Sequence, residues 1–337
     1  MRLFIFAPGL ANRHEIAHAI SIQAEDFYNG VGKCTLVLPL DSHNAALARK
    51  NSVLYIADKK LSYDIDEVLT DVDQRAITLN GRAICNRLNR RGVIAPAVIT
   101  QVEAGVYAAV QANLRGLEVS LLAAAGLSGT VNATTLYGGN LLTAIMPLLD
   151  SVGFGQRAVL DYTAKVVTWG IYKGVDRTAG MHRVVFSEER GTAPGLVIDD
   201  DISAYKNVCY CSAKYASGAE FVACAGAAEG DARREMWADY SGDAQAETES
   251  NAAFFARVAQ YAALQLYGTK DRCGFTVNID GTELGKAYNV GDFVCCVSLR
   301  SGVQFNARIT GANFSQDANG QSTKLTLGDP TLTILGG

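Results

Sequence analysis

The fold begins with Ile20-Ser-Ile-Gln-Ala-Glu-Asp-Phe-Tyr-Asn-Gly-Val-Gly-Lys-Cys-Thr-Leu-Val-Leu38, a segment whose first half alternates apolar and polar residues. A period of two predicts a half-buried strand. Asn29-Gly30 supplies the residues of a tight hairpin turn, and Cys34 to Leu38 returns as a second strand. The alternation reaches back to Ile16, so we predict one strand over residues 16–25.

The residues on either side of this hairpin divide the chain into three parts. Short apolar runs at Ser52–Ile56 and Ala76–Leu79 extend the β pattern to residue 79. Helical spacing then follows in three segments, which are Asn80–Gly92, Val102–Leu114 with Gly116 as a cap, and Asn140–Leu149 with Asn140 as the N-cap.

Strands return after Gly155. Residues 159–162 and 166–172 read as a strand pair, and 293–299 with 303–309 read as a hairpin. One amphipathic helix interrupts the last third at Asn251–Tyr267, with Gly268 beyond its end. Shorter strand candidates are 184–186, 207–211, 220–223, 235–237 and 322–327.

The length of 337 residues suggests two domains and leaves room for three. We therefore expect an α+β, mainly β, protein. Its predicted parts are an N-terminal β-domain over residues 1–79, an α/β middle domain over 80–180, and a C-terminal β-domain over 181–337 that contains the helix near 251–267.

Composition excludes several classes of protein. Hydrophobic residues make up 49% and charged residues 19%, which is incompatible with a disordered chain. The formal net charge of -4 argues against a broad basic surface for nucleic acid. Residues 119–149 lack charge but contain too many Ser, Thr, Asn and Gly residues for a membrane span. The eight cysteines show no C-x-x-C spacing, and we expect free, mostly buried thiols.

His14-Glu15-Ile16-Ala17-His18 is the sharpest catalytic-looking motif. On a helix, an H-E-x-x-H motif can place two imidazoles on one Zn²⁺ with the glutamate as general base. In a strand, His14 and His18 would lie about 13 Å apart and could not share a metal. Because the strand pattern continues from Ile16, we expect no metal site here and retain His14 and His18 only as weak candidates.

Other possible sites are weaker still. Asp199-Asp200-Asp201 could attract Ca²⁺ but lacks the spaced oxygens of a calcium loop, and Gly153-Phe154-Gly155 lacks the third glycine of a dinucleotide site. Arginine is dense at positions 82, 87, 90 and 91, where a polar helix face competes with a nucleic-acid patch. We expect no catalytic residue and no cofactor.

The order of short motifs resembles the baseplate hub or tail-tip (tail-associated) proteins of tailed bacteriophages and prophages, of the siphovirus type. The similarity covers roughly residues 1–330. The residues that carry it, taken as structural positions, are Tyr28, Asn29, Gly30, Gly32, Gly81, Gly138, Gly139, Asn140, Asp176, Arg177, Asn207, Gly291 and Asp292.

This resemblance implies the phage tail hub fold, with two barrel-like tube domains flanking or interleaved with the smaller middle domain. It further implies a homotrimer that forms a pseudo-sixfold ring around the DNA exit channel. The implied partners are a distal tail protein or tail-tube ring, a tape-measure protein, and a tail spike or fibre, with DNA passing through unbound. The implied location is the virion tail tip, assembled in the bacterial host cytoplasm. Asp176 and Arg177 would then form an ion pair or anchor a turn.

Two other functions stay open at this point. One is a zinc metallopeptidase or cell-wall endopeptidase that uses His14, Glu15 and His18. The other is a soluble binding module, such as a carbohydrate-binding protein.

Overall fold

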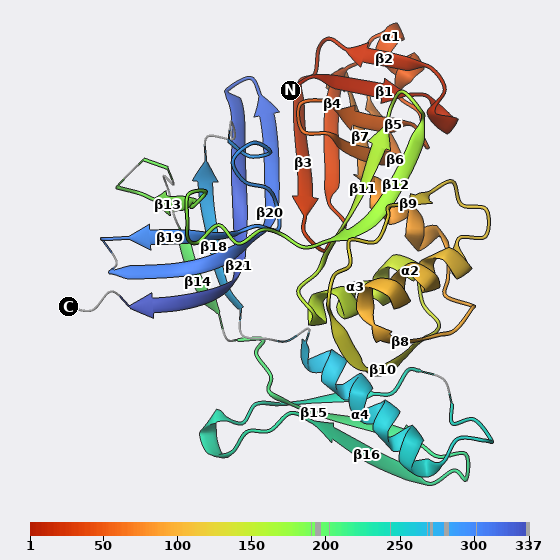
Figure 1. Ribbon diagram of the computed structural model, residues 1–337. Coiled ribbons are helices and arrows are strands. Elements are labelled where there is room, and N and C mark those ends of the chain that lie inside the picture. Colours follow the sequence, from red (N-terminus) through yellow and green to blue (C-terminus); the bar gives the residue numbers. More distant parts are fainter. Residues whose placement is uncertain are drawn as a thin grey trace.

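The computed structural model describes residues 1–189, 191–192, 197–201, 203–242, 244–267, 269, 272–279, 283–300 and 302–334. The protein is mainly β, and 13 of its described strands form one sheet (Figure 1). In sheet order, the N-terminal strands of this sheet are β3 (Ser21–Phe27), β4 (Lys33–Pro39), β7 (Ala76–Ala83), β6 (Leu61–Asp71), β5 (Val53–Ile56), β1 (Leu3–Phe6) and β2 (Arg13–Ile16).

The N-terminal strands must curl, because the chain connects the two ends of their row directly. Only residues 17–20 join β2 to β3, although five strands lie between them. Six interstrand spacings would separate the two by about 29 Å in a flat sheet. The connection spans at most about 18 Å. All seven strands contribute side chains to one enclosed core, which includes Ile5, Ile22, Leu36, Leu54 and Leu79.

The C-terminal strands extend the same sheet. Strand β20 (Val303–Asp317) pairs antiparallel with β3, from Gly311 opposite Phe27 to Gln316 opposite Ile22. The sheet therefore runs without a break from the red N-terminal strands to the blue C-terminal strands in Figure 1. The other C-terminal strands are β13 (Val185–Ser187), β14 (Val197–Asp201), β18 (Arg272–Ile279), β19 (Phe293–Ser298) and β21 (Gly320–Ile334).

The middle segment packs against the outside of the N-terminal curl. Phe4 and Phe6 of β1 and Val53 and Tyr55 of β5 share a core with the helices α2 (Val102–Asn113) and α3 (Leu141–Ser151). Strands β1 and β5 are therefore buried on both faces, which explains their continuous apolar sequences. The elements of this segment are the 3-10 helix η2 (Ile84–Arg90), β8 (Ala97–Gln101), α2 (Val102–Asn113), β9 (Ser120–Leu121), β10 (Thr130–Leu136), α3 (Leu141–Ser151), β11 (Gly155–Asp161) and β12 (Val166–Tyr172).

A small sheet and one helix form a further unit, seen at the bottom of Figure 1. Helix α4 (Asn251–Tyr267) covers one face of β15 (Val208–Lys214), β16 (Glu220–Ala225) and β17 (Glu235–Asp239). Cys209 and Cys211 are both buried beneath α4, as their shared strand face predicts. The remaining short helices are η1 (Pro8–Leu10), α1 (Ser42–Leu47) and η3 (Gly230–Ala232).

Several local predictions are confirmed. The hairpin of residues 20–38 forms as β3 and β4, residues 166–172 pair with β11, and β19 pairs with the first half of β20. The helices predicted from Val102 and over 251–267 are present. Among the described helices, none has both the length and the apolar character needed to cross a membrane.

Two local predictions are wrong. The strand expected over residues 16–25 is broken at 17–20, because Ile16 ends β2 whereas Ser21 begins β3 at the other end of the curl. Asn80-Gly81 does not open a helix but lies inside β7. A Cβ at Gly81 would lie 2.5 Å from the carbonyl oxygen of Asp64, so the glycine serves close strand packing there.

An ion-pair network attaches η2 to the outer face of the curl. Asp64 is 5% exposed and receives Arg87 in a bidentate arrangement, with Nη2 to Oδ1 at 2.7 Å and Nε to Oδ2 at 2.8 Å. Arg90 donates to the same carboxylate at 2.9 Å. These contacts, together with the Arg82–Asp66 pair and the Arg91 bond to the carbonyl of Leu114, give all four clustered arginines a structural role. Of the four arginines, Arg87 and Arg90 lie on the helix η2, whereas Arg82 lies in β7 and Arg91 follows η2, so the expected single polar helix face is wrong for two of them.

We predict that Asp64→Asn destabilises the protein by roughly 3 kcal/mol, because it leaves partly buried arginine charges uncompensated. The matched control is Asp66→Asn on the same strand, whose carboxylate makes only an exposed pair with Arg82 at 3.6 Å. That variant should cost less than about 1 kcal/mol. Urea unfolding followed by circular dichroism measures both, and equal losses would contradict the assignment.

Candidate functional site

Tyr28 lies where three parts of the chain meet, just after β3. Its hydroxyl donates to the carbonyl of Gly153 at 2.9 Å, ahead of β11, and accepts from the N–H of Gly174 at 3.4 Å, after β12. Its ring meets Tyr172 edge-on at 5.1 Å between centroids. We call the contact region of Tyr28, the β11–β12 hairpin and the residues around Gly291 the junction.

Arg308 closes the junction from the C-terminal side. It is 7% exposed and lies on β20. Its guanidinium carbon sits 4.6 Å from the ring centroid of Tyr28, while Nη1 donates to the carbonyl of Gly291 at 2.7 Å. The cation is therefore held by an aromatic face and a carbonyl dipole.

Two positions of the junction must be glycine, because the Tyr28 ring lies directly against their backbone. Gly291 has a φ of +101°, and a Cβ there would lie 2.5 Å from Tyr28 Cδ2. A Cβ at Gly155 would lie 2.3 Å from Tyr28 Cε2. Both distances are too short for any side chain, so the tyrosine ring fits only against bare backbone.

Asp292 ties the segment after β12 to the start of β19. It is 2% exposed, and its carboxylate accepts from the N–H of Val175 at 2.8 Å, from Nε of Arg177 at 2.6 Å and from the N–H of Asn289 at 3.0 Å. Arg177 therefore pairs with Asp292 rather than with Asp176. Asp176 caps its own turn by accepting from Thr178, which lowers the pKa of Asp176.

The structure brings together about half of the motif residues noted in the sequence. Asn29 donates to the carbonyl of Met146 at 2.9 Å, and the carbonyl of Gly30 accepts from Gln156 at 2.9 Å. The motif residues at or beside the junction are Tyr28, Asn29, Gly30, Arg177, Gly291 and Asp292. Those placed elsewhere are Gly32 in the first hairpin, Gly81 in β7, Gly138, Gly139 and Asn140 before α3, Asp176 in its turn, and Asn207 before β15.

Asn140 occupies the N-cap position of α3, but its side chain makes no capping hydrogen bond. Asn207 bridges the small sheet, since it donates to the carbonyl of Ala232 at 2.7 Å and accepts from the N–H of Arg234 at 2.7 Å. Both residues shape local structure.

Sequence reasoning missed Arg308 and Gln156. Arg308 lies in an alternating strand, where an arginine normally indicates the solvent face. Gln156 is 2% exposed and accepts from the indole N–H of Trp169 at 2.9 Å. No local signal marks either residue as buried, because each is buried by segments distant in sequence.

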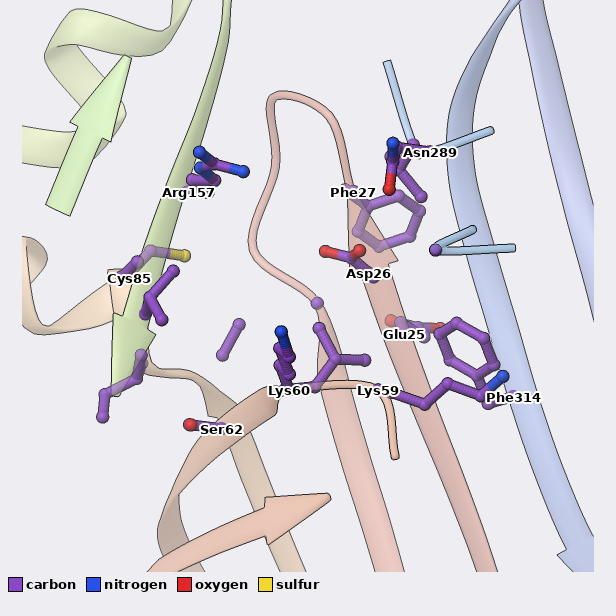
Figure 2. Close-up of a pocket in the computed structure, with 18 of the residues that line it drawn as sticks. Glu25, Asp26, Phe27, Lys59, Lys60, Ser62, Cys85, Arg157, Asn289 and Phe314 are labelled. Carbon is purple, nitrogen blue, oxygen red and sulfur yellow. The ribbon is translucent and has the colours of Figure 1, made fainter. Parts of the chain in front are cut away.

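A pocket of about 440 Å³ lies beside the junction (Figure 2). Its walls come from the end of β3, the turn between β5 and β6, the first residues of β11 and the loop of residues 284–290. Asp26 projects into it, and burial raises the pKa of this carboxyl to about 6 despite the opposing effect of Arg157. Burial also raises the pKa of the Cys85 thiol to about 11, so this thiol is not a ready nucleophile.

The His14 motif does not have the geometry of a zinc peptidase. His14 and Glu15 lie in β2, paired with Ile5 and Phe4 of β1, and His18 follows after the strand has ended. Glu15 forms an ion pair with Arg2 at 2.9 Å. The helical spacing that a shared Zn²⁺ needs is absent from this segment.

Within the described residues, no cluster of three or more His, Cys, Asp or Glu side chains could hold a metal ion. Asp199-Asp200-Asp201 belongs to β14, but its side chains lie outside the described residues, as does Gly268. The seven described cysteines are free thiols, and all but Cys224 are buried.

Comparison with solved structures places the fold among phage and prophage tail proteins. A tail protein from Neisseria meningitidis MC58 is similar with a TM-score of 0.59 and 14% identity, over 97% of this chain and 96% of that one. The 43 kDa tail protein of prophage MuSo2 from Shewanella oneidensis gives 0.58 and 13%, over 97% and 98%. Prophage tail protein gp18 from Listeria monocytogenes EGD-e gives 0.54 and 13%, over 98% and 94%.

The family model described as Siphovirus ReqiPepy6 Gp37-like protein matches residues 2–329. The chain belongs to this family. The resemblance to siphovirus tail proteins noted in the sequence is thereby confirmed. No curated protein matches the chain.

We predict that Gly291→Ala destabilises the protein by roughly 2 kcal/mol more than Gly302→Ala. Both positions have positive φ, but only a Cβ at Gly291 meets a neighbouring side chain, whereas Gly302 faces open space. The difference combines the overlap with Tyr28 and the greater backbone strain of an alanine at the φ of +101°, since Gly302 has a φ of +66°. Thermal unfolding of the two variants measures it, and equal melting temperatures would show that the junction relaxes without cost.

We predict that Asp26→Asn stabilises the protein at pH 8 and has little effect near pH 4. Since burial raises the pKa of Asp26 to about 6 from 3.8, ionisation of this carboxyl disfavours the folded state. That cost is complete above pH 6 and disappears as the pH falls towards 4. Urea midpoints across this range measure the effect, with exposed Asp73→Asn as the control for net charge. A gain that is independent of pH would contradict this account.

Proposed function

We propose that this chain is the structural hub of a bacteriophage or prophage tail tip or baseplate. Three copies form a pseudo-sixfold ring that joins the end of the hexameric tail tube to a threefold spike or fibre. The observation that carries the proposal is the continuous 13-stranded sheet, in which a curled N-terminal row of strands joins a C-terminal row. Membership of the family and the fold shared with tail proteins support a structural role in a tail.

In this proposal, the two rows of strands form two tube-like units in each chain. Residues 1–79 form the first unit and residues 181–337 contain the second, with residues 80–180 as the middle domain. Three chains then present six units, and a rotation repeated three times closes the ring with one type of interface. The unit made by α4 and the small sheet has its own core and stands outside the ring wall in this arrangement.

Such a ring needs a stiff junction in each of its chains. Asp292, Arg177, Tyr28 and Arg308 fix the angle between the two rows through contacts that link residues more than 100 positions apart. A ring closes only if every subunit holds the same angle. The buried charges and the fitted tyrosine ring therefore serve assembly rather than catalysis.

The HExxH segment has a structural explanation in this proposal. Strand β2 is one end of the 13-stranded sheet, and its Arg13, His14 and Glu15 are polar. Polar and charged side chains on an end strand discourage unwanted pairing with other chains. No observation favours an enzyme or a carbohydrate-binding module over the tail hub.

The proposed hub surrounds the path along which DNA leaves the particle. A net charge of -4 is compatible with a channel that DNA crosses without binding. Its proposed partners are a distal tail protein or tail-tube ring, the tape-measure protein, and a spike or fibre. It would assemble in the bacterial host cytoplasm and remain at the virion tail tip.

We predict that a reconstruction of the assembled particle places three copies of this chain around the tail axis. Quantitative mass spectrometry of purified particles provides an independent count, with the tail-tube protein as the reference that occurs in multiples of six. Three copies per particle are expected. Six equivalent copies, or copies away from the axis, would refute the pseudo-sixfold hub.

A further inference from the structure

The pocket beside the junction has unsatisfied polar groups of two kinds. Ser62 is 5% exposed, lines the pocket, and its hydroxyl makes no hydrogen bond. In the described part of the chain, the carboxylate of Asp26 likewise accepts no hydrogen bond. A buried polar group without a partner costs about 1–3 kcal/mol, so the Ser62 hydroxyl favours an occupant that can bond to it. The half-buried Asp26 carboxylate offers a further acceptor.

Cations stand at the opening of the pocket. Arg157 and Lys60 are exposed, and neither makes an ion pair with any described residue. Arg157 is held only over the ring of Tyr172, with its guanidinium carbon 5.1 Å from the centroid, so its N–H groups remain available. Burial lowers the pKa of Lys59 despite the opposing effect of Asp58, and repulsion from Lys286 lowers it further.

The acids of the pocket only partly balance these cations. Glu25 accepts the N–H of Lys33 at 3.1 Å, and Asp58 accepts the N–H of Arg2 at 2.7 Å, so both carboxylates are already bonded to backbone. In Figure 2, Arg157, Asp26, Lys59 and Lys60 border the same pocket. The pocket therefore offers cations for an anionic group at its mouth and an acceptor for N–H donors inside.

Apolar side chains complete the lining, among them Phe27, Val159, Leu284 and Val290. The volume of about 440 Å³ falls within the usual range of ligand pockets, about 300–1,000 Å³. An inorganic anion would leave the apolar wall uncovered. A peptide with an acidic residue between apolar residues supplies an anion, N–H donors and apolar surface together.

We propose that this pocket binds an acidic peptide segment of another protein chain. The acidic side chain pairs with Arg157 and Lys60, where a carboxylate can accept two parallel bonds from the guanidinium. Ser62 donates its hydroxyl to the segment, and Asp26 accepts from a backbone N–H. This inference stands whether or not the protein forms a trimeric hub, since it depends only on the pocket.

The test uses calorimetric titration of the full chain with the blocked pentapeptide acetyl-Ala-Leu-Glu-Leu-Ala-amide. The matched probe replaces Glu with Gln, which removes the charge and keeps the shape. We expect the Glu peptide to bind at least tenfold more tightly than the Gln peptide. No binding of the Glu peptide at millimolar concentration, or equal binding of the two, would overturn the proposal.

Variants of the protein locate the binding. Arg157→Gln, Lys60→Gln and Ser62→Ala should each weaken binding of the Glu peptide about fivefold or more. Lys214→Gln is the matched control, because Lys214 pairs with Glu220 on the exposed face of the small sheet, and it should change affinity less than twofold. Circular dichroism checks that each variant is folded. If Arg157→Gln fails to fold, Lys60→Gln and Ser62→Ala still decide the question, and unchanged affinity in both would refute the site.

Titrations with inorganic phosphate and with glutarate test whether the pocket binds small anions in general. Both should bind at least tenfold more weakly than the Glu peptide, because they lack its apolar body and its N–H donors. If either binds as tightly and competes with the peptide, the pocket is a simple anion site and the peptide assignment is wrong.

Discussion

The pairing of β3 with β20 is the contact on which the rest of the architecture depends. It joins residues 22–27 to residues 311–316, nearly 300 positions later in the chain. Without it, the N-terminal curl and the C-terminal strands would be separate sheets with open edges. With it, each row covers an edge of the other, and the end of β3 is fixed beside the C-terminal loop around Gly291. Tyr28, the next residue along, is thereby brought into the junction.

The junction then determines the angle between the two rows. Strand pairing alone permits twist and bending, since a sheet has no fixed curvature. Tyr28 against bare glycine backbone, Arg308 on the tyrosine face, and the buried Asp292–Arg177 pair restrict that freedom from three sides. The pocket lies beside these contacts, and its lining comes from the β5–β6 turn, β11 and the 284–290 loop.

The H-E-x-x-H motif shows how a short pattern depends on its context. The same five residues would support zinc chemistry on a helix, but here three of them end a strand and two follow it. The chain must leave β2 and reach β3 within residues 17–20, so His18 lies in this connection and not on the strand that holds His14. The charged residues that suggested catalysis instead occupy an end strand, where charge protects against association.

The sequence by itself determined the local elements and the family. Alternation predicted the hairpin at 20–38, helical spacing predicted α2 and α4, and ordered motifs indicated a siphovirus tail protein, because these signals depend on neighbours in the chain. Only the tertiary structure decided that Arg308 and Gln156 are buried, that Arg177 pairs with Asp292, and that Asp26 faces a pocket. The alternating pattern of a strand predicts which residues share a face. It does not predict which strand lies beside it or what covers that face. Burial and charge pairing between residues more than 100 positions apart are properties of the assembled sheet, so no local pattern records them.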